Sequence, residues 1–308
     1  MYPEPILVKA LKSPTKAIKA VQRKLKHSIE DRVRLLSPPQ SSTELINQKE
    51  IRIVGLKRTG NHAIINWIAH QQTGEVWKIN DVPPNENPHR HRYEYLQYEH
   101  PFGSIPQWKL DLCRREAKGE FTKKDCLIYS YEDHALNQIA SVSFEKKHDI
   151  YLGKTLKRYD LIILRDPFNL LASRFKSGFM EVKVHETVLE LWISYAQEYL
   201  GETQYLKNKK ICVNYNNWFT DINYRKQIAS QLKLKFDDSG IDQVSGIGGG
   251  SSFDKLSLQE KASTMDVLNR WKYFSDNELY RKLLKNEEIF KYSELVFGHI
   301  NGTEALLQ

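Results

Sequence analysis

The chain contains the stretch Ile51-Arg-Ile-Val-Gly-Leu-Lys-Arg-Thr-Gly-Asn-His-Ala-Ile-Ile-Asn-Trp-Ile68, in which an apolar run, a basic turn and a helical pattern follow one another. Residues 51–56 are mostly β-branched and apolar, the segment 57–60 ends that run, and an apolar helical period begins at Ala63. Unpaired backbone N–H groups at such a turn, together with the helix dipole, bind anions. Because Lys57 and Arg58 add full charges, the stretch predicts a site for a phosphate or a sulfate.

This turn differs from the loop that binds nucleoside triphosphates. That loop has Gly-x-x-x-x-Gly followed by Lys and a Ser or Thr that binds magnesium. Gly55 and Gly60 have the right separation, but Asn61 and His62 stand at the next two positions. An ordinary strand–helix turn with solvated basic residues is the alternative interpretation.

A second strand–helix junction lies at residues 159–178. An apolar run ends at Leu164, Arg165-Asp166-Pro167 follows it, and the proline suits the first position of a new helix. Ser173 lies eight residues after Arg165, about two turns into that helix. A guanidinium and a hydroxyl that converge in this way would clamp a phosphate. The alternative is an Arg165 paired with Asp166 and a serine without a role.

With both junctions in view, the chain resembles the PAPS-dependent sulfotransferases (PAPS is 3′-phosphoadenosine 5′-phosphosulfate). Arg58-Thr59-Gly60 matches their 5′-phosphosulfate loop, and Arg165, Ser173 and Gly178 match their 3′-phosphate motif. The resemblance covers roughly residues 50 to 275. It implies that PAPS is the co-substrate, that no metal is needed, and that a hydroxyl or amine acceptor receives the sulfuryl group. It also implies nucleotide contacts from the residues Lys57, Arg58, Thr59, Gly60, Asn61, His62, Arg165 and Ser173.

Two departures from the family pattern stand out. Family members often carry Thr-Thr where this chain has Asn61-His62, although an amide and a suitably protonated imidazole can also donate hydrogen bonds. Many members also have a late Arg-Lys-Gly segment that closes over the nucleotide. The nearest counterpart, residues 246–253, is glycine-rich and lacks the arginine. Its backbone amides would bind an anion if it folds as a nest, and otherwise it is a flexible linker.

The acceptor must lose a proton near the transition state, so the reaction needs a general base. Residues 125–134 read as a strand that ends in Glu132-Asp133-His134, and the family often places a catalytic His or Glu there. We expect Glu132 to be the base, with His134 as second choice and Asp133 as a cap of the next helix; a solvated charged turn is the alternative. Arg58, with Lys57, would stabilise the charge that develops on the sulfuryl group.

The rest of the chain predicts an α/β domain with a three-layer, P-loop-type parallel sheet flanked by helices. The expected parts are an N-terminal extension with linker, residues 1–48, and one domain over residues 49–308. Expected strands are 51–56, 76–79, 125–131, 159–164 and 210–215. Expected helices are 61–72, 107–118, 167–177, 184–200, 218–233, 257–272 and 276–285.

Composition narrows the class of protein. The formal net charge is +8, of which residues 1–38 carry +6, and no run of 18 apolar residues exists. Charge gathered at one end argues against a nucleic-acid protein. Without an apolar signal-peptide core we expect a cytoplasmic protein. Residues 5–26 form a basic amphipathic pattern that suits peripheral contact with a membrane, or a solubilising tail, and residues 35–43 read as a linker.

The acceptor is less well specified. Residues 80–106 are rich in Pro, His, Tyr and Arg and are expected to form a long irregular segment. It is either a binding loop, which favours a carbohydrate acceptor, or a merely solvated, exposed loop. Residues 214–217 receive no catalytic role, and the three cysteines have no metal-site spacing. Two other function classes stay open. One is a nucleotide-dependent kinase that uses Asp166 and magnesium, and the other is an inactive, membrane-associated binding protein.

Overall fold

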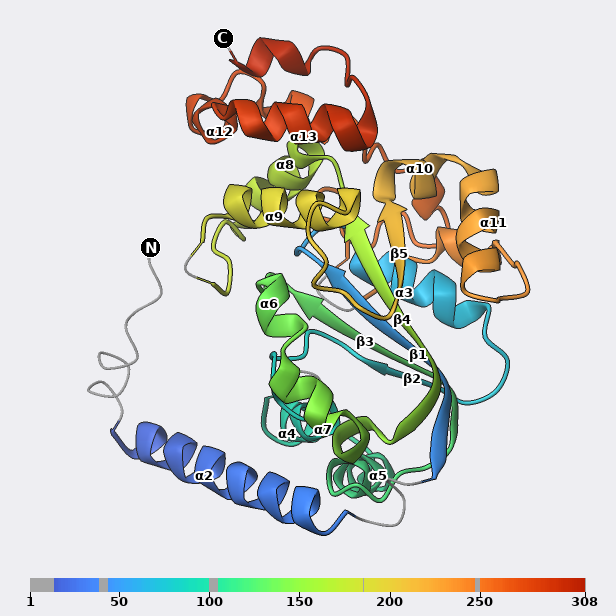
Figure 1. Cartoon of the computed structure of the whole chain (residues 1–308). Helices are drawn as coiled ribbons and strands as arrows, with labels where there is room; N and C mark the ends of the chain where they lie inside the picture. The colour runs from blue at the N-terminus through green and yellow to red at the C-terminus, as the bar shows by residue number, and fades with distance from the viewer. Residues whose placement is uncertain (1–13, 39–43, 100–104, 185, 247–249, 308) are drawn as a thin grey trace.

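Five parallel strands form one sheet in the order β2-β3-β1-β4-β5 (Figure 1). The computed structural model describes residues 14–38, 44–99, 105–184, 186–246 and 250–307. The predicted parallel α/β architecture is confirmed. The strands are β1 (Leu45–Gly55), β2 (Val76–Ile79), β3 (Lys124–Glu132), β4 (Lys154–Leu164) and β5 (Lys209–Asn214).

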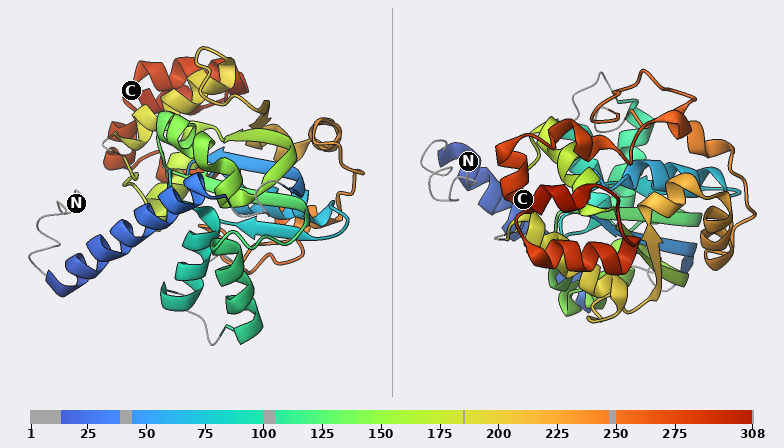
Figure 2. Two further views of the ribbon diagram at one scale, coloured as in Figure 1. Left: turned by 60° about the horizontal axis from the view of Figure 1, so that its bottom comes forward. Right: turned by 90° about the horizontal axis from the view of Figure 1, so that it is seen from above.

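Helices cover both faces of the sheet, so the molecule has two cores (Figure 2). Alternate residues of a strand point to opposite faces. Ile51 and Ile53 therefore pack in one core, and Val54 packs in the other. The first core includes side chains of α3 (Asn61–His70), α10 (Tyr215–Thr220) and α11 (Ile222–Gln231). The second includes side chains of α7 (Val142–Leu152), α8 (Pro167–Ser177), α9 (Val188–Leu200), α12 (Glu278–Leu284) and α13 (Glu287–Phe297).

Strand register brings three loops to one edge of the sheet. Gly55, the last residue of β1, lies opposite Glu132 of β3 and Ile163 of β4. Parallel sheets bind ligands beyond the carboxyl ends of their strands. The loops after β1, β3 and β4 therefore start at neighbouring points and can build one site.

The predicted helix over residues 257–272 is wrong. The segment instead holds two 3₁₀ turns, Ala262–Thr264 and Arg270–Phe274. Backbone carbonyls of this segment accept hydrogen bonds from side chains in other parts of the chain. Arg165 donates to the carbonyl of Val267 at 2.6 Å, and Asn169 donates to that of Leu268 at 3.0 Å. The apolar period therefore reflects burial of an irregular segment against α8.

Other elements in the structure also differ from the predicted ones. The predicted helix 218–233 is two helices, because Asp221 ends α10 and its carboxylate caps α11 by accepting from the N–H of Asn223. The expectation of an irregular segment at 80–106 is also wrong. That region holds α4 (Pro88–Glu94) and a π-helical turn, Tyr95–Glu99, while residues 100–104 lie outside the described part. The expected helices did not include α7 or α13. Two further helices are α5 (Gln107–Ala117) and α6 (Leu136–Ile139).

The N-terminal part contains α2 (Pro14–Leu36), which packs beside α7 and α4 (Figure 1). Residues 1–13 and 39–43, which belong to the predicted amphipathic segment and linker, lie outside the described residues. No described helix is both long enough and apolar enough to cross a membrane.

Candidate functional site

The turn between β1 and α3 has the backbone geometry of an anion-binding loop. Arg58 and Gly60 have φ angles of 73° and 90°, and the N–H of Thr59 bonds to the carbonyl of Leu56 at 3.2 Å. A Cβ on Gly60 would lie 2.1 Å from the ring of Tyr215, so this position requires glycine. The first N–H groups of α3 have no intrahelical acceptors and lie at the positive end of the helix dipole.

A buried ion pair braces this loop. Asp133 accepts from Nη1 of Arg174 at 2.8 Å, and both side chains are almost completely buried. The same carboxylate accepts from the N–H of Lys57 at 2.9 Å, while Arg174 donates to the carbonyl of Lys57 at 3.2 Å. The backbone N–H and the backbone carbonyl of Lys57 are therefore both held by this ion pair. The prediction that Asp133 caps the next helix is wrong, because the cap position of α6 is Ala135.

Thr59 and Asn61 also have their side chains engaged inside the loop. The Thr59 hydroxyl donates to the carbonyl of Leu56 at 2.7 Å. The Asn61 amide donates to the same carbonyl at 3.0 Å and to Glu132 Oε1 at 3.1 Å. Both side chains are buried, and Thr59 does not line the cavity described below. In this arrangement they shape the loop, and Asn61 lines the cavity together with Lys57, Arg58 and His62.

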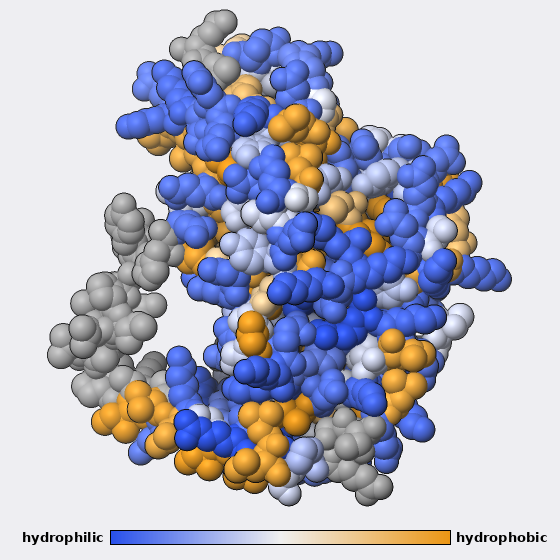
Figure 3. All heavy atoms as spheres, in the orientation of Figure 1, coloured by the Kyte–Doolittle hydropathy of each residue, from blue (hydrophilic) through white to orange (hydrophobic). Residues whose placement is uncertain are grey.

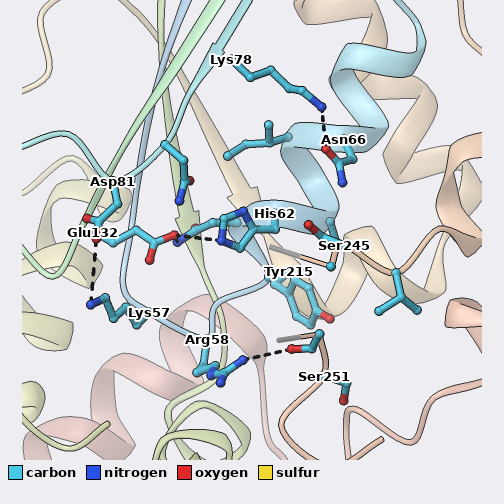
Figure 4. A pocket seen from close by; sticks show the side chains of 18 of the residues that line it. Lys57, Arg58, His62, Asn66, Lys78, Asp81, Glu132, Tyr215, Ser245 and Ser251 are labelled. Atoms are coloured by element: carbon cyan, nitrogen blue, oxygen red, sulfur yellow. Dashed lines mark hydrogen bonds and ion pairs between the residues drawn. The ribbon is translucent and has the colours of Figure 1, made fainter. Parts of the chain in front are cut away.

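Glu132 lies beside the loop with an unusual proton affinity. Burial, followed by the charge of Asp81, raises the pKa of Glu132 to about 7. His62 Nε2 lies 4.0 Å from Glu132 Oε1 (Figure 4). Since burial lowers the pKa of His62 to about 4, this imidazole is neutral at neutral pH and the contact is not an ion pair. The carboxyl can thus exchange a proton near neutral pH, as a general base must.

His134, the second candidate for the general base, lines the same cavity as Glu132. Its side chain is buried, and Nε2 has no hydrogen-bond partner among the described residues. Burial, and then the charge of Lys183, lowers the pKa of His134 to about 4. Its backbone carbonyl accepts from the Tyr195 hydroxyl at 2.8 Å.

Two arginines converge on Ser173 at the second junction. Arg165 Nη1 and Arg270 Nη1 each lie 3.2 Å from the Ser173 hydroxyl oxygen. Arg165 also donates to the carbonyl of Arg58 at 3.1 Å, which links this cluster to the anion loop, and lies over the ring of Tyr215. Ser173 is fully buried behind the two guanidinium groups. The serine therefore ties two cations together at the cavity wall.

The sequence interpretation did not include Arg270. It comes from a 3₁₀ turn 97 residues after Ser173, and no local pattern relates the two. Burial lowers the pKa of Arg270 to about 10, with Arg165 as the next cause. The group still carries its charge at neutral pH. A buried cation that lies beside another cation favours an anionic ligand.

Asp166 does not face the cavity. It caps α8 and accepts from the backbone N–H of Asn169 at 2.8 Å, and its carboxylate is fully buried. Burial raises its pKa. The described residues show no ion pair between Arg165 and Asp166. They also contain no group of three or more His, Cys, Asp or Glu side chains that could hold a metal.

The glycine-rich segment, residues 246–253, also contacts the site. Residues 247–249 lie outside the described part. Arg58 Nη1 donates to the carbonyl of Gly250 at 3.1 Å, and Arg270 Nη2 donates to the Ser251 hydroxyl at 2.7 Å. Arg58 and Arg270, which both line the cavity, therefore also hold this segment.

The anion loop, Glu132, His134, Arg165 and Arg270 border one cavity of about 1160 Å³ (Figure 4). Among the described residues, nine charged side chains line it, seven of them cationic: Lys57, Arg58, Lys78, Arg92, Arg165, Lys183 and Arg270, with Asp81 and Glu132 as the two carboxylates. Of the ten predicted site residues, eight line the cavity, and Thr59 and Ser173 lie buried behind it. Tyr215, which was given no catalytic role, also lines it. The excess of positive charge suits a polyanionic ligand.

The sequence matches no protein-family model and no curated protein. In fold, the chain is similar to sulfotransferases. The sulfotransferase domain from the Synechococcus PCC 7002 olefin synthase aligns at 10% identity and a TM-score of 0.49, over 85% of this chain and 98% of that one. The sulfotransferase domain from the curacin biosynthetic pathway aligns at 11% identity and a TM-score of 0.48, over 84% and 100%. Mouse sulfotransferase SULT7A1 complexed with PAP aligns at 12% identity and a TM-score of 0.42, over 89% and 92%. At such identities the likeness concerns the path of the chain alone.

Proposed function

We propose that this protein is a PAPS-dependent sulfotransferase that moves a sulfuryl group to a hydroxyl or amine acceptor. One observation carries the proposal. The anion loop with Arg58, and the separate pair Arg165 and Arg270, open into the same cavity as a carboxyl whose pKa is about 7. PAPS carries phosphate groups at two positions, so its binding requires two cationic clusters. A ligand with a single phosphate would require only one.

The nucleotide would lie between the two clusters. Arg165 and Arg270 would hold the 3′-phosphate, which positions the nucleotide. Arg58, Lys57 and the N–H groups at the start of α3 would contact the phosphosulfate. The mouse neighbour was solved with PAP, which is the product that transfer from PAPS would leave.

Transfer would proceed in line. The acceptor oxygen forms a bond to sulfur as the bond between sulfur and the bridging oxygen of the 5′-phosphate breaks, and adenosine 3′,5′-bisphosphate leaves. The acceptor proton passes to the carboxylate of Glu132; His134 is the second candidate base. Negative charge grows on the bridging oxygen, where Arg58 and Lys57 stabilise it, and one such donor is typically worth ~3 kcal/mol. Neutral His62 can donate a hydrogen bond nearby.

The far end of the cavity would hold the acceptor. Lys78 donates to Asn66 at 3.0 Å (Figure 4), and Arg92 lies over the ring of Trp77. Neither cation forms an ion pair with a described acidic residue. Tyr95 of the π-helical turn also lines this region. Cations beside an aromatic ring suit a carbohydrate acceptor that carries an acidic group.

Calorimetric titration with adenosine 3′,5′-bisphosphate tests the nucleotide site. We expect tight binding by the wild type, strong loss in Arg165→Ala, and no comparable binding of ATP with Mg²⁺. Transfer of labelled sulfate from PAPS to a panel of acidic and neutral saccharides would follow. Absence of bisphosphate binding would refute the proposal, and tight binding of ATP with Mg²⁺ would favour a kinase. If the bisphosphate binds but Arg58→Ala leaves cellular function intact, the chain is a binding protein.

A further inference from the structure

Helix α2 packs against the protein through its polar side. Asp31 accepts from Arg90 Nη2 at 2.8 Å and also accepts from the Tyr151 hydroxyl. His27 Nε2 lies 2.9 Å from Glu94, one turn along α4 from Arg90. Asp31 is buried although it is charged. This side of the helix is therefore fixed by ion pairs and hydrogen bonds, where most surface helices dock through apolar side chains.

The apolar side of α2 points to solvent. Six large side chains recur every three or four residues along it and together form what we call the apolar stripe: Ile18, Val21, Leu25, Ile29, Val33 and Leu36. Each exposes between 54 and 88% of its surface. At 100° per residue all six fall within one third of the helix circumference, opposite Asp31. Figure 3 shows these apolar side chains along α2 at the lower left of the molecule.

Basic residues flank the apolar stripe. The sequence 14–36 contains seven Lys or Arg and two Asp or Glu. Exposed Lys24 and Lys26 lie on opposite sides of the stripe, and exposed Arg32 lies within its arc, between the angular positions of Val21 and Leu25. A second copy of the same helix would bring these like charges together, which opposes a dimer through this face. An anionic surface would attract them.

We propose that the apolar stripe of α2 binds the surface of a membrane that contains anionic lipids. The helix would lie in the plane of the membrane, with the six apolar side chains below the headgroups and the flanking lysines at the phosphates. The segment from Ile18 to Leu36 spans about 27 Å, so the contact would be extended. This inference concerns a different part of the molecule from the cavity and stands without the proposed reaction.

The position of α2 also relates the membrane to the cavity. Arg90 and Glu94 hold α2, while Arg92 of the same short helix α4 lines the cavity. A membrane-bound α2 would therefore lie one helix away from the proposed acceptor end. Arg90 also reaches Glu30 at 3.4 Å, and Arg23 lies 3.7 Å from Glu94, so several polar contacts join α4 to α2.

Vesicle sedimentation of the full-length chain tests the proposal. We expect binding to phosphatidylcholine vesicles that contain phosphatidylserine and much weaker binding to phosphatidylcholine alone. The triple variant Val21→Ser, Leu25→Ser, Ile29→Ser should lose about 1,000-fold in affinity, because each aliphatic side chain that leaves water contributes on the order of tenfold. Lys24→Gln with Lys26→Gln should lose roughly tenfold on the anionic vesicles and little on the neutral ones.

The matched control removes exposed apolar side chains elsewhere. Val142 and Leu279 are each 67% exposed and lie on α7 and α12. The double variant Val142→Ser, Leu279→Ser should bind vesicles like the wild type. Circular dichroism and thermal unfolding would establish that all variants fold, which is expected because every changed side chain is in solvent.

Four results would overturn the proposal. One is unchanged vesicle binding by the triple serine variant, and another is equal binding to neutral and anionic vesicles. The third is a wild-type dimer in light scattering that the triple variant converts to monomer, since the stripe would then be covered by a second copy. If removal of residues 1–13 is needed before vesicles bind, those residues occupy the stripe and the proposal also fails for the full chain.

Discussion

The pair Arg165 and Arg270 offers the sharpest test of the nucleotide site. If Arg270 holds the 3′-phosphate, Arg270→Gln removes one charge-assisted hydrogen bond to it. Such a bond is worth about 1.5–3 kcal/mol, which corresponds to about 10- to 100-fold in affinity. Its side chain keeps its charge at neutral pH, because its pKa is lowered only to about 10. Arg270→Lys should retain part of the affinity.

The assay compares two ligands. Calorimetry with adenosine 3′,5′-bisphosphate should show the full loss, whereas adenosine 5′-monophosphate, which lacks the 3′-phosphate, should bind wild type and variant alike. Arg270 also donates to Ser251 at 2.7 Å and lies 3.2 Å from Asp254. Ser251→Ala is therefore the matched control, because it removes this tie to the glycine-rich segment and leaves the guanidinium in place.

Two outcomes would refute the reasoning. Equal losses for both nucleotides would mean that Arg270 supports the fold of the site and does not read the 3′-phosphate. A loss in Ser251→Ala as large as that in Arg270→Gln would mean that the segment around Gly250, held by both arginines, carries the effect.

Three further predictions concern the loop and the base. The pKa of Glu132 is raised to about 7, and its carboxylate form is the base, so kcat/KM should fall about tenfold per pH unit below pH 7 and level off above it. Glu132→Gln should lower the rate about 10²- to 10⁴-fold. A pH profile that this substitution leaves unchanged would contradict the role of Glu132 as the base. Arg174→Met leaves Asp133 charged and buried without its partner and should cost about 3–5 kcal/mol in urea unfolding; a loss below 1 kcal/mol would show that the pair is not strongly coupled. Gly60→Ala places a Cβ against the Tyr215 ring at a φ of 90° and should abolish bisphosphate binding, with a drop in melting temperature; normal binding by this variant would show that the loop adapts.

Local sequence was sufficient where a function depends on residues within one strand–helix junction. Arg58 and Gly60 lie in the turn after β1, and Arg165 follows β4 directly, so an apolar run and the residues after it reveal both junctions. Glu132 could be found in the same way, because it ends β3. The pKa of Glu132 could not, since it depends on burial and on Asp81, which comes from another loop.

The secondary structure predicted for two segments was wrong for a related reason. An apolar period over residues 257–272 resembles that of a helix, but carbonyls there accept from Arg165 and Asn169. Such bonds join positions about 100 residues apart and leave no trace in either local pattern. The irregular appearance of residues 80–106 hid α4 in the same way, because its buried His89 and Arg90 read as exposed polar residues.

The sequence by itself determined the alternation of strands and helices, the position of the two basic strand–helix junctions and the basic, amphipathic character of α2, since each is a property of neighbouring residues. Tertiary structure alone decided that Arg270 joins Arg165 at Ser173, that Asp133 and Arg174 clamp Lys57, and that α2 turns its apolar side outward. The physical reason is that burial, charge pairing and the orientation of a helix depend on groups brought together from distant parts of the chain. A periodic pattern states which face of a helix is apolar, and the packing of the whole chain states whether that face meets protein or solvent.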